Sequence, residues 1–229
     1  MANTIAGSKN IAASGKVLRV RTATLADISA IAALSKRVYT GTGIDPYSRA
    51  ELRGQLNNFP EGKFAVTLDE EIVGYCATFR VSGDVCLRPH SWAAITANGY
   101  GTRHDPEGEW LYGMEVCVDS SVRGYRIGQR LYNARKKLCE ELGLKGIVFV
   151  GRLPSLSRRI KKYGTAENYL DAVVNQKTRD PVLSFQLRNN FEVIDLMPNY
   201  LTDDKDSMGY GVHLVWHNPK VETAASVAH

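Results

Sequence analysis

The chain has 229 residues, of which 44% are hydrophobic and 23% are charged, and its formal net charge is +5. These values are ordinary for a globular protein and favour one domain with embellishments. No apolar run approaches the roughly 20 residues that cross a bilayer, and the N-terminus lacks the apolar core of a secretory signal. The mild positive charge is concentrated in two segments, so we expect neither a membrane surface nor a nucleic acid as the main partner.

The cysteines indicate the compartment. Cys76, Cys86, Cys117 and Cys139 show no paired spacing, and two of them fall inside apparent strands. They are therefore expected to be buried, reduced thiols, neither disulfide-bonded nor bound to a metal. The prediction is a cytoplasmic protein without a metal site.

The first third of the chain predicts alternating elements after a small, polar segment, residues 1–16, which reads as a flexible tail. Residues 17–22 form a predicted strand, and Thr24 opens a helix with Asp27 at the capping-box position. Ser48 caps a second predicted helix that runs to Asn58. Two further strands follow at residues 63–68 and 72–81, joined by a short acidic turn.

Residues 83–108 show no sustained period and are predicted to form a long loop. Loops of this length in a compact domain are usually functional or mobile. His90, Trp92, Tyr100 and His104 are its aromatic and titratable residues. The alternative is a surface excursion that packs through Trp92.

The stretch from Trp110 to Gly143 predicts a strand, a polar loop and a long helix. Residues 110–118 are rich in β-formers and alternate apolar with other side chains. Gly143 stands where a left-handed residue would end the helix. The helix carries one apolar stripe, formed by Ile127, Leu131, Ala134, Leu138 and Leu142.

The loop between that strand and helix has the features of an anion site. It reads Arg-Gly-Tyr-Arg-Ile-Gly from Arg123 to Gly128, and Arg130 follows. Backbone N–H groups at a helix N-terminus favour a negatively charged ligand. Together with the arginines they predict a site for a polyanion such as a pyrophosphate.

The remainder predicts a buried strand at 146–150 and an insertion at 151–180 that holds a helix over 165–176. A helix then starts at Asp180-Pro181. Strands are expected at 191–196 and 208–216, followed by a loose tail.

The run VCVDSSVRGYRIGQRL resembles the acyl-CoA-binding motif of the GNAT superfamily of N-acyltransferases. Arg123 and Gly128 match the first and last motif positions, whereas Arg126 replaces the middle glycine. SFQLRNNF resembles a second family segment, in which Phe185 fits and Gln186 replaces a tyrosine that is often proposed as the acid. Residues 17–217 also resemble GNAT domains linked to nitrilase-type carbon–nitrogen hydrolases.

This resemblance implies an α/β fold (α+β by some schemes), with a mixed, twisted sheet of about six to seven strands flanked by helices. Insertions lie around 83–108 and 151–180, and tails at 1–16 and 218–229 flank the domain at 17–217. The implied activity is transfer of an acetyl group from acetyl-CoA, without a metal, to a primary amine by direct attack in a ternary complex. The amine is a small molecule or a peptide, and an oligomer is possible.

The resemblance also assigns residues to roles. The expected cofactor residues are Val116, Cys117, Val118, Arg123, Gly124, Tyr125, Arg126, Ile127, Gly128 and Gln129. Arg130 or the cations of 158–162 are candidates for the ribose phosphate. We expect His90, Trp92 and Tyr100 beside the acceptor.

Glu115 is the candidate base, because a carboxylate in a partly dry site can have a raised pKa. Glu115 as a structural ion-pair partner, or deprotonation through water by His90 or His104, are the alternatives. The acid stays open among Tyr163, Tyr169, Tyr200 and Tyr210. The alternative function is an acyl-CoA-binding module without turnover, possibly a partner of a nitrilase-type hydrolase.

Overall fold

The computed structural model describes residues 9–11, 15–122 and 124–221. A single mixed sheet with the strand order β1-β2-β3-β4-β5-β6-β8-β7 forms its centre. All neighbouring pairs are antiparallel except β5 and β6. The strands are β1 (Lys9–Ile11), β2 (Val17–Thr22), β3 (Lys63–Leu68), β4 (Glu71–Val81), β5 (Trp110–Val118), β6 (Gly146–Arg152), β7 (Glu192–Met197) and β8 (Gly211–His217).

The mixed α/β architecture predicted from the sequence is confirmed, and the strand count differs by one. Seven strands follow the predicted order, and β1 adds an eighth inside the segment predicted as a flexible tail. β1 consists of three residues that pair with β2. Such a short strand has too few residues to show a period, so its pairing depends on the neighbouring strand.

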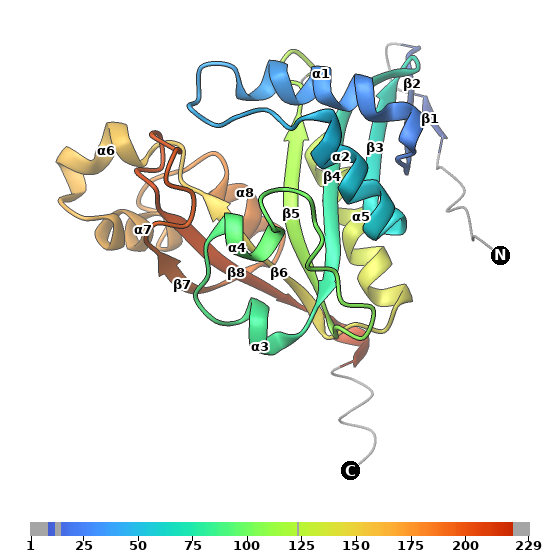
Figure 1. Cartoon of the computed structure of the whole chain (residues 1–229). Helices are drawn as coiled ribbons and strands as arrows, with labels where there is room; N and C mark the ends of the chain where they lie inside the picture. The colour runs from blue at the N-terminus through green and yellow to red at the C-terminus, as the bar shows by residue number, and fades with distance from the viewer. Residues whose placement is uncertain (1–8, 12–14, 123, 222–229) are drawn as a thin grey trace.

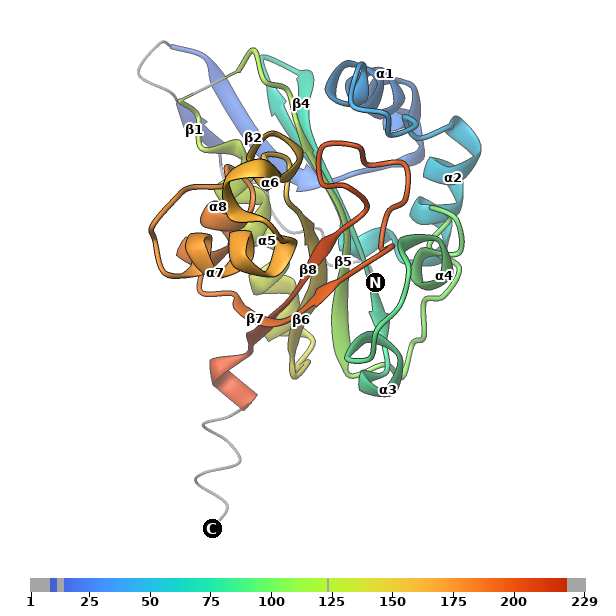
Figure 2. The same cartoon turned by 90° about the vertical axis from the view of Figure 1, so that its left-hand side faces the viewer.

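Helices cover both faces of the sheet (Figures 1 and 2). The helices α1 to α4 lie on one face, which we call the α1 face, and α5 to α8 lie on the other, the α5 face. They are α1 (Ile28–Tyr39), α2 (Arg49–Asn58), α3 (Gly83–Cys86), α4 (Trp92–Thr96), α5 (Ile127–Glu141), α6 (Leu156–Tyr163), α7 (Ala166–Val174) and α8 (Leu183–Arg188), with 3-10 turns η1 (Leu25–Asp27) and η2 (Pro60–Gly62).

Local sequence signals explain several helix ends. Ser48 caps α2 by accepting a hydrogen bond from the Glu51 N–H, and the Glu51 carboxylate accepts one from the Ser48 N–H. Gly143 has a φ of +63° just beyond α5, as expected of a left-handed end. The boundaries of α2 and β5 agree with the predicted ones.

The region predicted as a long loop is ordered by two short helices, α3 and α4. Gln55 on α2 donates a hydrogen bond from Nε2 to the Gly99 carbonyl (2.8 Å), and the ring of His104 stacks on that of Phe59. Contacts with other elements therefore determine this region, which is why its sequence shows no period of its own.

Strands β5 and β6 diverge. Their parallel pairing covers only Trp110–Tyr112 against Gly146–Val148. Beyond that point β5 stays paired with β4, and β6 stays paired with β8. The later part of β5 consequently has one edge without a ladder partner in β6.

A β-bulge opposite β4 changes which way β5 side chains point. The pairing shifts from Thr78–Gly113 to Ala77–Glu115, which leaves Met114 as the extra residue. Residues 112 and 115 would face opposite sides of a regular strand, because side chains alternate. With the bulge, Glu115 and Tyr112 both contact partners on the α1 face.

Candidate active site

Two residues of the loop before α5 have a left-handed backbone. Gly124 and Arg126 both have a left-handed conformation, with φ of +87° and +52°. Arg126 is the N-cap residue of α5. The first N–H groups of a helix have no partners within it and attract anions. The predicted Arg123 lies outside the described residues.

The left-handed backbone shows what the arginine at position 126 costs. The family motif has a glycine there, and glycine adopts positive φ without steric cost. An arginine in this conformation costs roughly 1–2 kcal/mol. The arginine therefore adds backbone strain and places a cation at the N-terminus of α5.

Packing determines where α5 begins. Ile127 is buried, and a Cβ at Gly74 of β4 would lie 2.6 Å from its Cγ2 atom. A Cβ at Gly128 would lie 3.5 Å from the Phe185 ring, which is ordinary contact. Gly74 is thus required for close helix–sheet packing, whereas Gly128 has room for a small side chain.

The other predicted cofactor residues lie around this corner. Arg130 donates from Nε to the Tyr125 carbonyl (3.2 Å), and Gln129 donates to the Asn189 side chain. Val116, Cys117 and Val118 lie on the part of β5 that pairs only with β4. The cations of 158–162 lie on α6, which Figure 1 shows on the side of the molecule away from α5.

Glu115 lies on β5 just beyond the divergence, on the α1 face. Its Oε1 atom accepts a hydrogen bond from the Tyr39 hydroxyl at 2.6 Å. Burial raises the pKa of Glu115, while the Tyr39 and Tyr47 hydroxyls and the nearby Arg152 act in the opposite direction. The net effect is a raised pKa, which suits a group that must accept a proton.

Tyr47 places a second hydroxyl beside this carboxylate. The Tyr47 hydroxyl is buried and is directed toward Glu115. Burial, the charge of Glu115 and a hydrogen bond to that carboxylate raise the pKa of Tyr47, so the two groups are close. Its ring centroid lies 6.2 Å from that of Trp92.

Arg152 ends β6 on the opposite side of the divergence. It forms a bidentate ion pair with Asp204, with Nε–Oδ2 and Nη2–Oδ1 distances of 2.6 Å. Asp206 lies 3.9 Å from the same Nη2 atom. Asp204 is fully buried, and the guanidinium lowers its pKa below the usual range against the effect of burial.

His90 ends a buried hydrogen-bond chain on the α1 face. Burial lowers the pKa of His90 to about 4, so the ring is neutral. Nδ1 lies 2.7 Å from the Arg88 carbonyl and must donate to it, so Nε2 accepts from the Tyr112 hydroxyl at 2.9 Å. The Tyr112 oxygen in turn accepts from Tyr200 at 3.0 Å.

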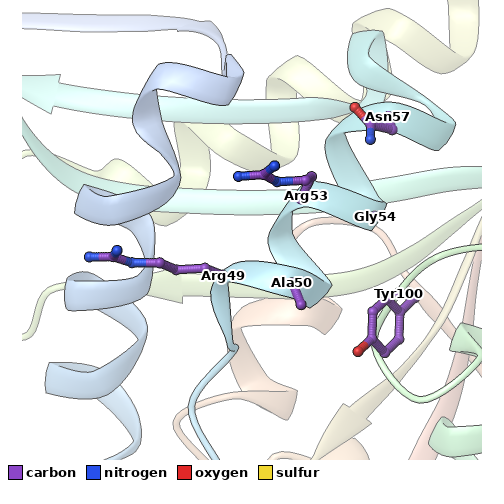
Figure 3. Close-up of a pocket in the computed structure, with 6 residues that line it drawn as sticks. All are labelled: Arg49, Ala50, Arg53, Gly54, Asn57 and Tyr100. Carbon is purple, nitrogen blue, oxygen red and sulfur yellow. The ribbon is translucent and has the colours of Figure 1, made fainter.

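The predicted acceptor residues separate into two places. Trp92 lies beside Tyr47 near Glu115, and its backbone N–H donates to the backbone carbonyl of Tyr200. Tyr100 instead lines a groove of about 550 Å³ on the outer side of α2 (Figure 3). That groove is lined by Arg49, Ala50, Arg53, Gly54, Asn57 and Tyr100, and Glu115 is not part of it.

The candidates for the acid lie in different parts of the molecule, and Gln186 stands where the family has a tyrosine. Gln186 is buried against Gly151, and its Oε1 atom has no hydrogen-bond partner in the described part of the chain. Tyr169 donates to Asp180, in the insertion that contains α6 and α7. Tyr200 lies near Glu115, whose charge adds to burial in raising its pKa.

Sequence reasoning missed Tyr39, Tyr47, Arg152 and Asp204. The only signal was weak: Arg152 follows the apolar run of β6, and Asp204 belongs to an acidic cluster in a loop. Their partners lie far away in the chain: Tyr39 and Glu115 are separated by 76 positions, and Arg152 and Asp204 by 52.

Within the described ranges, no helix is long and apolar enough to cross a membrane. In the same residues, no group of three or more His, Cys, Asp or Glu side chains has the arrangement of a metal site. The four cysteines are free and buried.

The fold is a mixed sheet whose parallel strands β5 and β6 part beside the N-terminus of α5. The sequence profile described as acetyltransferase (GNAT) family matches residues 28–161. The chain therefore belongs to the GNAT family.

Two relatives from Bacillus subtilis (strain 168) are similar to this chain. "Probable hydrolase YhcX" is 40% identical over 192 residues, which are 84% of this chain and 37% of that protein. "Uncharacterized N-acetyltransferase YkwB" is 31% identical over 172 residues, 75% of each chain. This chain thus spans little more than a third of YhcX, which agrees with the resemblance to hydrolase-linked GNAT domains.

A solved structure, described as "GphF GNAT-like decarboxylase in complex with isobutyryl-CoA", shares the fold with a TM-score of 0.74 and 27% identity. The match covers 87% of this chain and 99% of that one.

Proposed function

We propose that this protein transfers an acetyl group from acetyl-CoA to a primary amine of a small molecule or peptide. The observation that carries the proposal is the position of Glu115, a carboxylate with a raised pKa beside the unpaired edge of β5. The left-handed backbone before α5 supports the proposal, because a Cβ at Gly124 would meet nothing within 4 Å and the site is open to a diphosphate.

Each part of the site has a task in this reaction. Bound acetyl-CoA would supply the thioester, whose C–S bond breaks as the amine nitrogen forms a C–N bond, and coenzyme A leaves as its thiolate. Glu115 accepts the proton that the attacking amine loses, and the Tyr39 hydroxyl orients the carboxylate. Backbone N–H groups at the start of α5 hold the diphosphate, with Arg126 beside them. The edge of β5 from Val116 to Val118 lies along the pantetheine chain.

The Glu115→Gln substitution tests the proposal. It keeps the shape of the side chain and removes the proton acceptor, so kcat should fall by about 10²- to 10⁴-fold. Thiol release from acetyl-CoA with an amine panel measures kcat, and calorimetry should show unchanged coenzyme A affinity. Glu192→Gln, on the exposed face of β7, is the matched control. Equal activity of Glu115→Gln and wild type would remove Glu115 from the mechanism.

Two observations favour other functions of the same fold. The likeness to a GNAT-like decarboxylase favours loss of carbon dioxide from an acyl-CoA that bears a free carboxylate. The hydrolase name of YhcX favours a binding module that serves a hydrolase partner. Carbon dioxide release, or retention on an immobilised nitrilase-type hydrolase without any turnover, would identify these alternatives.

Four free cysteines fit the reducing cytoplasm that we propose as the location.

A further inference from the structure

The charges around Glu115 do not balance. Arg152 is the cation whose charge reaches Glu115, and both oxygens of Asp204 already accept hydrogen bonds from it. Asp206 adds a second carboxylate at 3.9 Å from the same guanidinium. Three carboxylates thus share one cation, and the guanidinium offers little attraction to any further anion.

The polar groups beside Glu115 suit a donor. Its carboxylate accepts one hydrogen bond from Tyr39 and retains further lone pairs. The buried Tyr47 hydroxyl also lies at this carboxylate and is directed toward it. An amine nitrogen can donate to the lone pairs of Glu115 that remain, and the ring of Trp92 beside Tyr47 supplies an apolar wall.

We infer that the site at Glu115 selects amines that carry no carboxylate next to the reacting nitrogen, and excludes α-amino acids with a free carboxyl group. The inference rests on the proposed function and names its acceptor class. A carboxylate on the acceptor would lie close to Glu115, and Arg152, the cation that acts on Glu115, is already paired with Asp204. Repulsion between two such charges, at an effective dielectric constant near 20, is enough for about a 10- to 100-fold loss in kcat/KM.

The pairing of Arg152 with Asp204 is the device that maintains this selectivity. If Asp204 released the guanidinium, Arg152 could pair with an incoming carboxylate in a bidentate geometry. Asp204 would therefore determine acceptor choice without contacting the acceptor, as a positioning residue.

Matched acceptors test the inference. Tyramine, tyrosine and tyrosinamide share one ring and one amine, and only tyrosine carries a carboxylate. Wild type should accept tyramine and tyrosinamide with kcat/KM at least about 10-fold above that for tyrosine. In the presence of coenzyme A, calorimetry should rank their binding in the same order. Equal values for tyrosine and tyrosinamide would overturn the inference.

Two variants should move this preference in opposite directions. Asp204→Asn frees Arg152 and should raise the tyrosine-to-tyrosinamide ratio by about 10-fold, whereas Arg152→Gln should lower it further. Asp203→Asn is the control, because Asp203 is exposed and is not an ion-pair partner of Arg152. Thermal unfolding verifies that each variant folds. An unchanged ratio in a folded Asp204→Asn protein would refute the positioning role.

The two hypotheses fail differently. If no amine releases thiol from acetyl-CoA, the proposed function fails, and the calorimetric ranking of tyrosine against tyrosinamide still decides the inference. If all three amines react at similar rates, the proposed function stands and the inference alone is wrong.

Discussion

At the scale of single residues, the most unusual group outside the site is the buried lysine of β3. Lys63 is only 1% exposed, and no acidic side chain pairs with it among the described residues. Its Nζ atom donates to the carbonyls of Phe59 (2.8 Å) and Thr78 (2.6 Å). Burial lowers the pKa of Lys63 to about 7. The protein therefore tolerates a lysine that is partly neutral at physiological pH.

Lys63 should make stability depend on pH. Its pKa is about 7 in the folded state and 10.5 in the unfolded state, so the unfolded chain binds more protons between these values. The free energy of unfolding should then rise with pH, by at most ~1.4 kcal/mol per pH unit. Urea unfolding at pH 7.0 to 8.5 measures this rise in the free energy of unfolding. At higher pH the buried thiols, whose pKa values are raised, would lower the stability and oppose the effect of Lys63.

The matched variants are Lys63→Met and Lys161→Met. Lys63→Met should flatten the pH dependence and lower stability, because the two carbonyls lose their donor. Lys161 is exposed on α6, so its replacement should leave the wild-type slope. A Lys63→Met protein that keeps the wild-type slope would show that other groups produce it.

At the scale of elements, the junction of β5 and α5 combines strain with charge. Arg126 begins α5 in a left-handed conformation, and its side chain makes no capping hydrogen bond. A cation at a helix N-terminus is also unfavourable for the helix dipole. Both costs would be offset if Arg126 contacts an anionic ligand, as the proposed function requires.

Arg126→Gly should therefore have two effects of opposite sign. Removing the left-handed side chain should raise the free energy of unfolding by up to about 1 kcal/mol. Removing the cation should weaken coenzyme A binding several-fold and make it less sensitive to salt. Arg126→Lys keeps the charge and the strain and is the control. Tighter binding by Arg126→Gly would show that the loop, and not the charge, limits affinity.

At the scale of the whole molecule, the divergence of β5 and β6 organises both faces of the sheet. The start of α5 lies on the α5 face, whereas Glu115, Tyr39 and Tyr47 lie on the α1 face. A ligand that reaches both must pass between the strands. The edges of the sheet, at β1–β2 and β7, lie away from this passage.

Hydrogen exchange should show whether coenzyme A binds between β5 and the start of α5. Coenzyme A should slow amide exchange at residues 116–118 and 124–130, and leave β2 unchanged, because binding protects only the segments that close around the ligand. Exchange measured by mass spectrometry with and without coenzyme A tests this. Protection confined to the groove beside Tyr100 would place the ligand elsewhere and contradict the cofactor site.

Much of the fold could be predicted because its signals are local. The limits of β5, the cap of α2 and the end of α5 at Gly143 follow from alternation, a capping box and a left-handed glycine. The pairing of β1, the helices α3 and α4, and the bulge at Met114 could not be predicted. Each depends on a partner segment, and a single residue more or less in a strand reverses every later side chain.

The candidate site divides in the same way. By itself the sequence determined the family, the loop before α5 and Glu115 as the candidate base, because a helix N-terminus and its flanking residues are contiguous. Only the tertiary structure decided what surrounds Glu115. Tyr39, Tyr47, Arg152 and Asp204 come from four separate elements, and their charges and hydroxyls influence one another only after the sheet brings them within a few ångströms.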